Sequence, residues 1–117
     1  MKMTYKEIAT MIRAIGLPFA YHQFTEDTAQ PPPFICFSYP QSDDLQADNA
    51  NYQRIEQLQI DLYSDNKDFT NEAAIESALF NAGLTWEKIE NYIDSERMFM
   101  ITYQSEVLIT QEVQDNG

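Results

Sequence analysis

The sequence predicts an α+β fold: a mostly antiparallel β-sheet of four to five strands with two helices packed on one face. Three observations predict it. Two segments have helical spacing and end in Gly-Leu, the segment Tyr52 to Tyr63 alternates apolar and polar residues, and the chain closes with a long hairpin pattern. The 117 residues suit one domain, expected over residues 1 to 110, with a flexible tail over 111 to 117.

The first helix follows a capping box, because Thr4 and Glu7 have the spacing at which each side chain satisfies a backbone N–H of the other. An apolar stripe then repeats at helical spacing through Ile8, Ile12 and Ile15. Gly16, followed by Leu-Pro, predicts the end of this helix.

Two short strands are predicted next. Residues 19 to 24 (FAYHQF) are rich in aromatic side chains, as strands are. The run of three prolines, residues 31 to 33, favours an extended chain and leads into a strand from Phe34 to Tyr39. Because proline has no N–H to donate to a sheet, Pro40 is expected to end that strand.

A long exposed loop is predicted from Gln41 to Asn51 (QSDDLQADNAN), which has almost nothing to bury. Such loops inside a compact domain are often functional, so this one is a contact candidate. The strand that follows has Leu58, Ile60 and Leu62 on one face and polar residues on the other. Ile55 breaks this alternation, which predicts a bulge or a change of burial near Glu56.

Asp68 or Thr70 is expected to cap a second helix, whose apolar face includes Ile75 and Leu79 and which ends at Gly83. Its acidic residues, Glu72 and Glu76, are expected to face water. The remaining chain reads as a hairpin of TWEKIENYI, a DSER turn and MFMITYQSEVLI. Polar residues on one side of its last strand predict a sheet with a wet face.

The formal charge of −12 excludes some partners. An acidic surface repels phosphate backbones and anionic lipids, so direct nucleic-acid binding and membrane binding are disfavoured. Solubility is the simplest reason for such a charge, and mimicry of DNA is a second one. A single cysteine and an N-terminus without an unbroken apolar stretch indicate a protein made in the reducing cytoplasm.

Catalytic and ligand-binding patterns are weak in this sequence. His22 and Cys36 are the only residues of their kinds, and a buried thiol and a strand histidine explain them better than a thiolate pair. The acidic loop residues Asp43, Asp44 and Asp48 lack the spacing and the glycine of a calcium loop. We therefore predict no enzyme activity, no catalytic or metal-binding residues and no cofactor.

Several ordered pieces resemble one protein family. These are LPFAYHQF, the proline run before a strand, the Tyr-Pro exit into an acidic loop, the strand ending in DLYSDNKD, and the SER turn before the last strand. Over Tyr5 to Ile109 the chain resembles the tail terminator, or tail-completion, proteins of long-tailed phages and prophages of Gram-positive hosts. None of these pieces is a catalytic motif, so the resemblance depends on their order and coverage.

The resemblance implies a structural virion protein with no cofactor. It implies a homo-oligomeric ring, of six copies, at the head-proximal end of the tail tube, where it stops tube polymerisation and joins the tail to the head connector. Its partners would be the major tail tube protein and the head–tail connector or stopper protein, with assembly in the host cytoplasm and a final place in the tail or neck of the virion.

Interface residues are inferred from the sequence pattern alone. They lie in the acidic loop and on the polar sides of the two long strands: Asp43, Asp44, Leu45, Asp48, Tyr52, Gln57, Gln59, Thr102 and Gln104. Two other functions fit the same residues. One is a different neck or head-closure adaptor, and the other is an acidic DNA mimic that inhibits a host nucleic-acid-binding protein.

Overall fold

The computed structural model describes residues 2–42, 45–46 and 52–110. It confirms the α+β class, with two α-helices on a mixed, mostly antiparallel sheet, and it has more strands than the four to five predicted. The elements in chain order are β1 (Lys2–Met3), α1 (Tyr5–Ala14), β2 (Phe19–Tyr21), the 3₁₀ helix η1 (Glu26–Thr28), β3 (Phe34–Ser42), β4 (Leu45–Gln46), β5 (Tyr52–Ser64), α2 (Phe69–Asn81), β6 (Glu87–Ile93) and β7 (Met98–Ile109).

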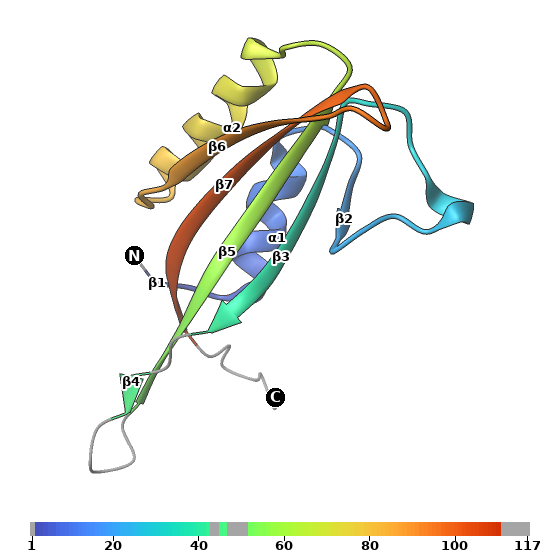
Figure 1. Cartoon of the computed structure of the whole chain (residues 1–117). Helices are drawn as coiled ribbons and strands as arrows, with labels where there is room; N and C mark the ends of the chain where they lie inside the picture. Colours follow the sequence, from blue (N-terminus) through green and yellow to red (C-terminus); the bar gives the residue numbers. More distant parts are fainter. Residues whose placement is uncertain (1, 43–44, 47–51, 111–117) are drawn as a thin grey trace.

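The two long strands, β5 and β7, form the middle of the sheet (Figure 1). The strand order is β1-β7-β5-β3-β2. On the same side of β7 as β1, β6 pairs with the first half of β7, whereas β1 pairs with its end. β4 pairs with the start of β5. The pairs formed by β3, β5, β7 and β6 are antiparallel. The two short edge strands are parallel to their neighbours, β1 to β7 and β2 to β3.

Both helices lie against one face of the sheet (Figure 1) and have the predicted ends. Thr4 and Glu7 form the capping box of α1, and Asp68 rather than Thr70 caps α2 by accepting a hydrogen bond from the N–H of Asn71. Gly16 and Gly83 follow the two helices at φ 93° and 77°, in the left-handed region that glycine adopts without strain.

The core lies between the helices and this face. Ile8 and Ile12 of α1, and Ile75 and Leu79 of α2, are fully buried there. Alternate residues of the long strands face them, which confirms the apolar pattern of the sequence: Leu58, Ile60, Leu62, Ile101, Tyr103, Val107 and Ile109. The odd-numbered residues of β5 and the even-numbered residues of β7 point to the other face, which carries no helix.

Strand boundaries differ from the prediction at two places. The strand expected over residues 19–24 ends at Tyr21, because His22 has a φ of 70° and turns the chain away from the sheet. Pro40 does not end the next strand. Instead, the pairing of β3 with β5 shifts register between Ser38 and Gln41, so a bulge accommodates the proline and β3 continues to Ser42.

Of the bulge or change of burial predicted near Glu56, the change of burial is confirmed, because the neighbours Ile55 and Glu56 are both buried. β5 has no bulge there, since it pairs with β7 without interruption from Arg54 to Ser64. Ile55 is buried on the face away from the helices, while Glu56 points to the helix side and accepts hydrogen bonds from Tyr5 and Ser42. Part of the loop predicted over residues 41–51 is strand, since Gln41 and Ser42 belong to β3 and Leu45–Gln46 pairs with Gln53 and Tyr52.

Within the described residues, the helices are too short or too polar to cross a bilayer. The expected tail over 111–117 lies outside the described residues.

We predict that Leu58→Ala and Ile101→Ala each lower the free energy of unfolding by about 2 to 5 kcal/mol, because each leaves a cavity in the core. Both side chains are at most 1% exposed. Urea unfolding measures the change. Ile89→Ala, at a side chain that is 45% exposed, is the matched control. An unchanged urea midpoint in either core variant would show that its side chain does not face the core.

Candidate functional site

The candidate site is the sheet face that carries no helix, called here the open face. Its centre is formed by polar residues of β5 and β7 that lie directly opposite one another: Gln57 with Glu106, Gln59 with Gln104, and Asp61 with Thr102. The Gln57 amide donates to Glu106 Oε2 at 3.4 Å. Cross-strand polar pairs of this kind give the centre of the face several hydrogen-bonding groups.

Asp61 is buried near the middle of this face, at 8% exposure. The Thr102 hydroxyl donates to Asp61 Oδ1 at 2.6 Å, and the Gln59 amide donates to Oδ2 at 3.1 Å. Two donors compensate for the desolvation of the carboxylate. Thr102 is itself only 5% exposed. Its hydrogen bond holds the Asp61 carboxylate in place, and the carboxylate in turn orients the Gln59 amide.

A shallow depression lies beside this pair of strands. The bulge of β3 contributes Pro40 and Gln41, and the strands beyond it contribute Gln57, Leu58, Gln59 and Gln104. Three of the predicted interface residues, Gln57, Gln59 and Gln104, therefore come together at one surface. Gln41 was predicted as the first residue of the contact loop and not as part of β3, because Pro40 was expected to end the strand. A proline inside a strand is itself a sign of a bulge.

One end of the open face is covered by the connection between β2 and β3. The ring of Phe24 packs edge-on against Phe34 at 5.3 Å, and Phe34 stacks on Tyr63 at 4.8 Å between centroids. Burial raises the pKa of Tyr63 to about 12. The connection thus covers this end of β3 and β5, whereas the glutamines lie at the other end of the face.

Cys36 lies beneath this covered end and is 5% exposed. Burial raises the pKa of its thiol, and the charge of Asp61 raises it further. A nucleophilic cysteine needs a lowered pKa in an electropositive, accessible place, so Cys36 has the opposite surroundings. In the described parts of the chain, no group of three or more His, Cys, Asp or Glu side chains is placed to hold a metal ion.

The acidic loop is only partly described. Leu45 lies in β4 and Tyr52 at the start of β5, and these two strands extend beyond the helices as a narrow hairpin (Figure 1). Asp43, Asp44 and Asp48 lie outside the described residues. The hairpin continues the strand that carries Gln57 and Gln59, so it lengthens the surface on which the predicted residues lie.

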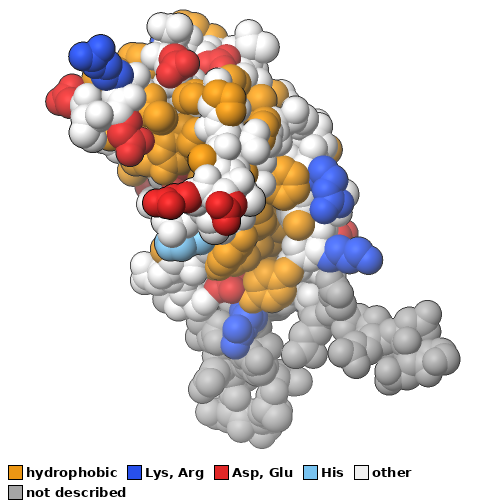
Figure 2. Space-filling view, turned by 90° about the vertical axis from the view of Figure 1, so that its right-hand side faces the viewer, with side chains coloured by type: hydrophobic (Ala, Val, Ile, Leu, Met, Phe, Trp, Pro, Cys, Tyr) orange, Lys and Arg blue, Asp and Glu red, His pale blue; other side chains and the backbone are white. Residues whose placement is uncertain are grey.

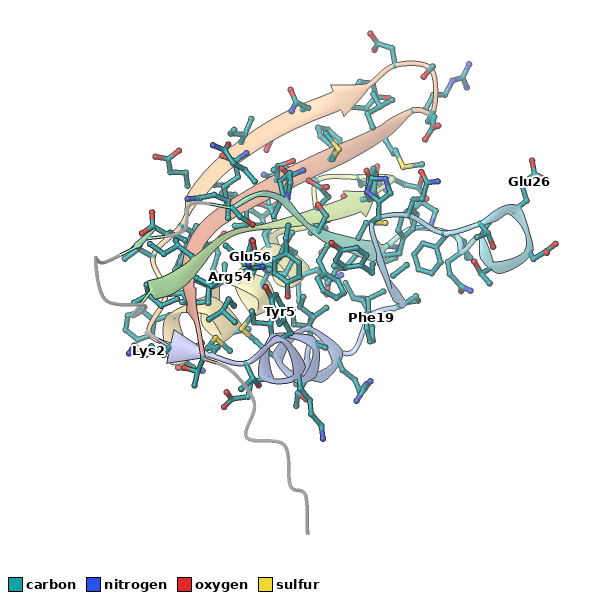
Figure 3. The ribbon with its side chains drawn as sticks, turned by 90° about the horizontal axis from the view of Figure 1, so that it is seen from below. Lys2, Tyr5, Phe19, Glu26, Arg54 and Glu56 are labelled. Atoms are coloured by element: carbon teal, nitrogen blue, oxygen red, sulfur yellow. The ribbon has the colours of Figure 1, made fainter. Side chains whose placement is uncertain are left out.

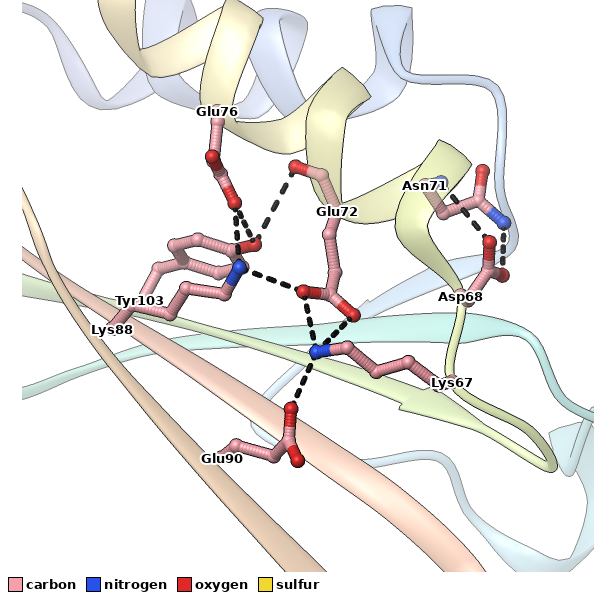
Figure 4. A network of polar contacts seen from close by, with 8 residues as sticks. All are labelled: Lys67, Asp68, Asn71, Glu72, Glu76, Lys88, Glu90 and Tyr103. Atoms are coloured by element: carbon pink, nitrogen blue, oxygen red, sulfur yellow. Dashed lines mark hydrogen bonds and ion pairs between the residues drawn. The ribbon is translucent and has the colours of Figure 1, made fainter.

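A cluster of charged side chains fills the space between α2 and β6 on the helix side (Figure 4). Glu72 lies at its centre and is 2% exposed. Lys67 Nζ lies 2.9 Å from Glu72 Oε2, and Lys88 Nζ lies 2.7 Å from Glu72 Oε1. Lys67 also pairs with Glu90. The cluster therefore ties α2 to the edge strand β6.

Glu76 completes this cluster. Lys88 Nζ is 2.9 Å from Glu76 Oε2, and the Tyr103 hydroxyl donates to the same oxygen at 2.8 Å. The expectation that Glu72 faces water is wrong, because β6 pairs along the outer edge of β7 and brings Lys88 over the helix. In the sequence, Lys88 and Glu90 of β6 (EKIE) are two positions apart and share one side of the strand. This pattern of opposite charges could have predicted a strand that forms ion pairs.

These features define an α+β protein whose sheet has one face covered by helices and one polar face left open. No protein-family model matches the chain, and no curated protein matches it. A chain from a solved structure titled "Virion of native gene transfer agent (GTA) particle" is similar over 89% of this chain and 88% of its own length, with a TM-score of 0.48 and 15% sequence identity. The function of this chain has to be argued from its own residues.

We predict that Glu76→Gln flattens the loss of stability in acid. The hydrogen bond from Lys88 lowers the pKa of Glu76, with the Tyr103 hydroxyl also lowering it. A lowered pKa in the folded state gives stability that is full above the unfolded value near 4.5 and is lost as pH falls through the lowered value.

Thermal unfolding at several pH values from 7 down to about 3 would measure this effect. Glu96→Gln, in the exposed turn between β6 and β7, is the control for the change in net charge. An identical pH profile for wild type and Glu76→Gln would show that this ion pair does not contribute to folding.

Proposed function

We propose that the chain is a structural virion protein of a long-tailed phage or prophage. It forms a ring of six copies at the head-proximal end of the tail tube, stops tube polymerisation there and joins the tail to the head connector. The resemblance of its ordered segments to tail terminator proteins supports this role. The conclusion rests on one structural observation, the open face, because a protein whose function is assembly needs a large surface that its own helices leave free.

The chemistry of the open face suits a protein partner. Gln41, Gln57, Gln59 and Gln104 offer amide donors and acceptors without net charge, so they can pair with backbone and side-chain groups of another chain. Asp61 and Thr102 hold Gln59 in place, which reduces the side-chain entropy lost on binding. A partner docked here would cover the glutamines, and the hairpin of β4 and β5 would extend the contact.

The charge of the chain is consistent with this position. A ring through which DNA passes gains from surfaces that do not hold the phosphate backbone, and a net charge of −12 supplies such repulsion. The same charge is the observation that favours the second candidate, an acidic inhibitor of a nucleic-acid-binding protein, which would bind a basic partner in a salt-sensitive way.

Deletion of the gene tests the proposed function. Electron microscopy of the particles should show filled heads beside unjoined tails of uncontrolled length, and a plasmid copy of the gene should restore joined particles. Normal joined virions without the gene would refute the structural role and favour the acidic inhibitor.

We predict that Gln41→Arg/Gln104→Arg folds normally but fails to restore joined particles. Both residues are exposed at the depression, and burying two unpaired charges in a contact costs several kcal/mol. Gln23→Arg/Gln30→Arg adds the same charge at exposed positions of the β2–β3 connection and should restore them. Full rescue by the first variant, with unchanged melting of both, would remove the glutamine surface from the interface.

A further inference from the structure

The basic residues of this acidic chain are unevenly placed. Of its seven lysines and arginines, Lys67 and Lys88 are held in the ion-pair cluster under β6. Residues 1–21 contain three of the others and a single carboxylate, Glu7, which is engaged in the capping box. By contrast, residues 67–97 contain seven carboxylates and three basic side chains. The two parts of the chain thus have opposite charge.

Two of these basic residues, Lys6 and Arg13 of α1, lie beside an exposed aromatic patch. We name this surface the α1 flank and define it by Tyr5, Lys6, Arg13, Phe19 and Tyr21. Tyr5 and Tyr21 are 40% and 56% exposed, and the guanidinium of Arg13 lies over the ring of Phe19 at 5.9 Å. Figure 2, which faces the β2 side of the molecule, shows a hydrophobic patch with basic side chains along one margin.

Contacts within the protein hold this flank in shape. The Tyr5 ring packs edge-on against Tyr39 at 5.3 Å, and Tyr21 lies 5.3 Å from Phe37. The Tyr5 hydroxyl donates to Glu56 Oε2 at 2.7 Å. Figure 3 shows the Tyr5 side chain directed toward Glu56 and Arg54, with Lys2 and Phe19 near the two ends of α1. Rings fixed in this way lose little freedom when a partner covers them.

The opposite edge carries the complementary features. We name it the α2 flank and define it by Phe69, Phe80, Glu90 and Tyr92. Phe69 and Phe80 are each 74% exposed, and their separation of eleven positions, about three turns, places them on the same side of α2. Tyr92 is 50% exposed on the edge strand. Carboxylates outnumber cations here, so the flank is apolar and acidic where the α1 flank is apolar and basic.

We infer that the ring forms by contact between the α1 flank of one copy and the α2 flank of the next. This inference rests on the proposed function. The flanks lie at opposite edges of the sheet, since β2 ends one side of the strand order and β6 lies on the outer side of β7. A contact between two different patches of the same chain repeats around a ring when the rotation closes.

Charge complementarity makes a second copy the partner that fits. Copies with a net charge of −12 repel each other unless they meet through surfaces of opposite sign. Strand addition at β6 is opposed by the charged residues Glu87, Lys88 and Glu90 on that edge, so side chains make the contact rather than a continued sheet. The open face then stays free for a different partner, above or below the ring.

A charge-swap experiment tests this contact in the deletion host. Lys6→Glu/Arg13→Glu makes the α1 flank acidic, and Phe80→Lys/Tyr92→Lys makes the α2 flank basic. Alone, each variant places like charges against each other, so joined particles should fall by about tenfold or more. When the two variants are co-expressed, they can alternate around the ring. Each acidic flank then meets a basic flank of the neighbouring copy, so joined particles should recover. Glu26→Lys, on the outlying η1, changes the net charge by the same amount as Phe80→Lys/Tyr92→Lys and should behave as wild type (Figure 3).

Light scattering and circular dichroism of the purified variants would establish that each folds. Joined particles at the wild-type level with either variant alone would overturn the flank contact and leave the proposed function standing. Failure of the two folded variants to recover joined particles together would also overturn it. Normal virions in the absence of the gene would instead refute the proposed function itself, whatever the variants do.

Discussion

The pairing of β5 with β7 is the constraint on which the rest of the structure depends. Eleven residue pairs run without interruption from Arg54 opposite Ile109 to Ser64 opposite Phe99. Because side chains alternate along a strand, this single register decides which residues face the helices and which form the open face. A slip by one residue would exchange Leu58, Ile60 and Leu62 for Gln57, Gln59 and Asp61 and would remove both the core and the polar surface.

Most of the remaining strands pair directly with β5 or β7. β3 and β4 share one edge of β5, while β6 and β1 share the outer edge of β7. This arrangement places Lys88 and Glu90 over α2, so the second helix is fixed by ion pairs as well as by Ile75 and Leu79. It also leaves the two sheet edges with different side chains, which is what a contact between unlike surfaces requires.

Local patterns in the sequence were sufficient for the helices and the central strands. The capping box at Thr4, the glycines after each helix and the alternation of Leu58, Ile60 and Leu62 depend on near neighbours, and all of them hold in the structure. β1 was not predicted, and β2 was predicted as part of a longer strand without its parallel pairing, since two or three residues give no periodicity and their pairing depends on distant partners. The burial of Glu72 was not predicted either, because it depends on ion pairs with Lys67 and Lys88.

In the candidate site, the alternation of polar residues along the strands predicted Gln57, Gln59 and Gln104. Gln41 joins them through a bulge in β3, which is visible only once the strands are paired.

The covered end of the open face has a consequence for the covalent chemistry of an assembly. Cys36 is the single thiol of each copy and lies beneath the Phe24, Phe34 and Tyr63 rings with a raised pKa. Exchange with a disulfide needs an accessible thiolate, and neither condition is met here. Copies of this chain brought close together therefore avoid random cross-linking through Cys36 in oxidising surroundings. In the proposed ring, the contacts between subunits would accordingly stay non-covalent and reversible.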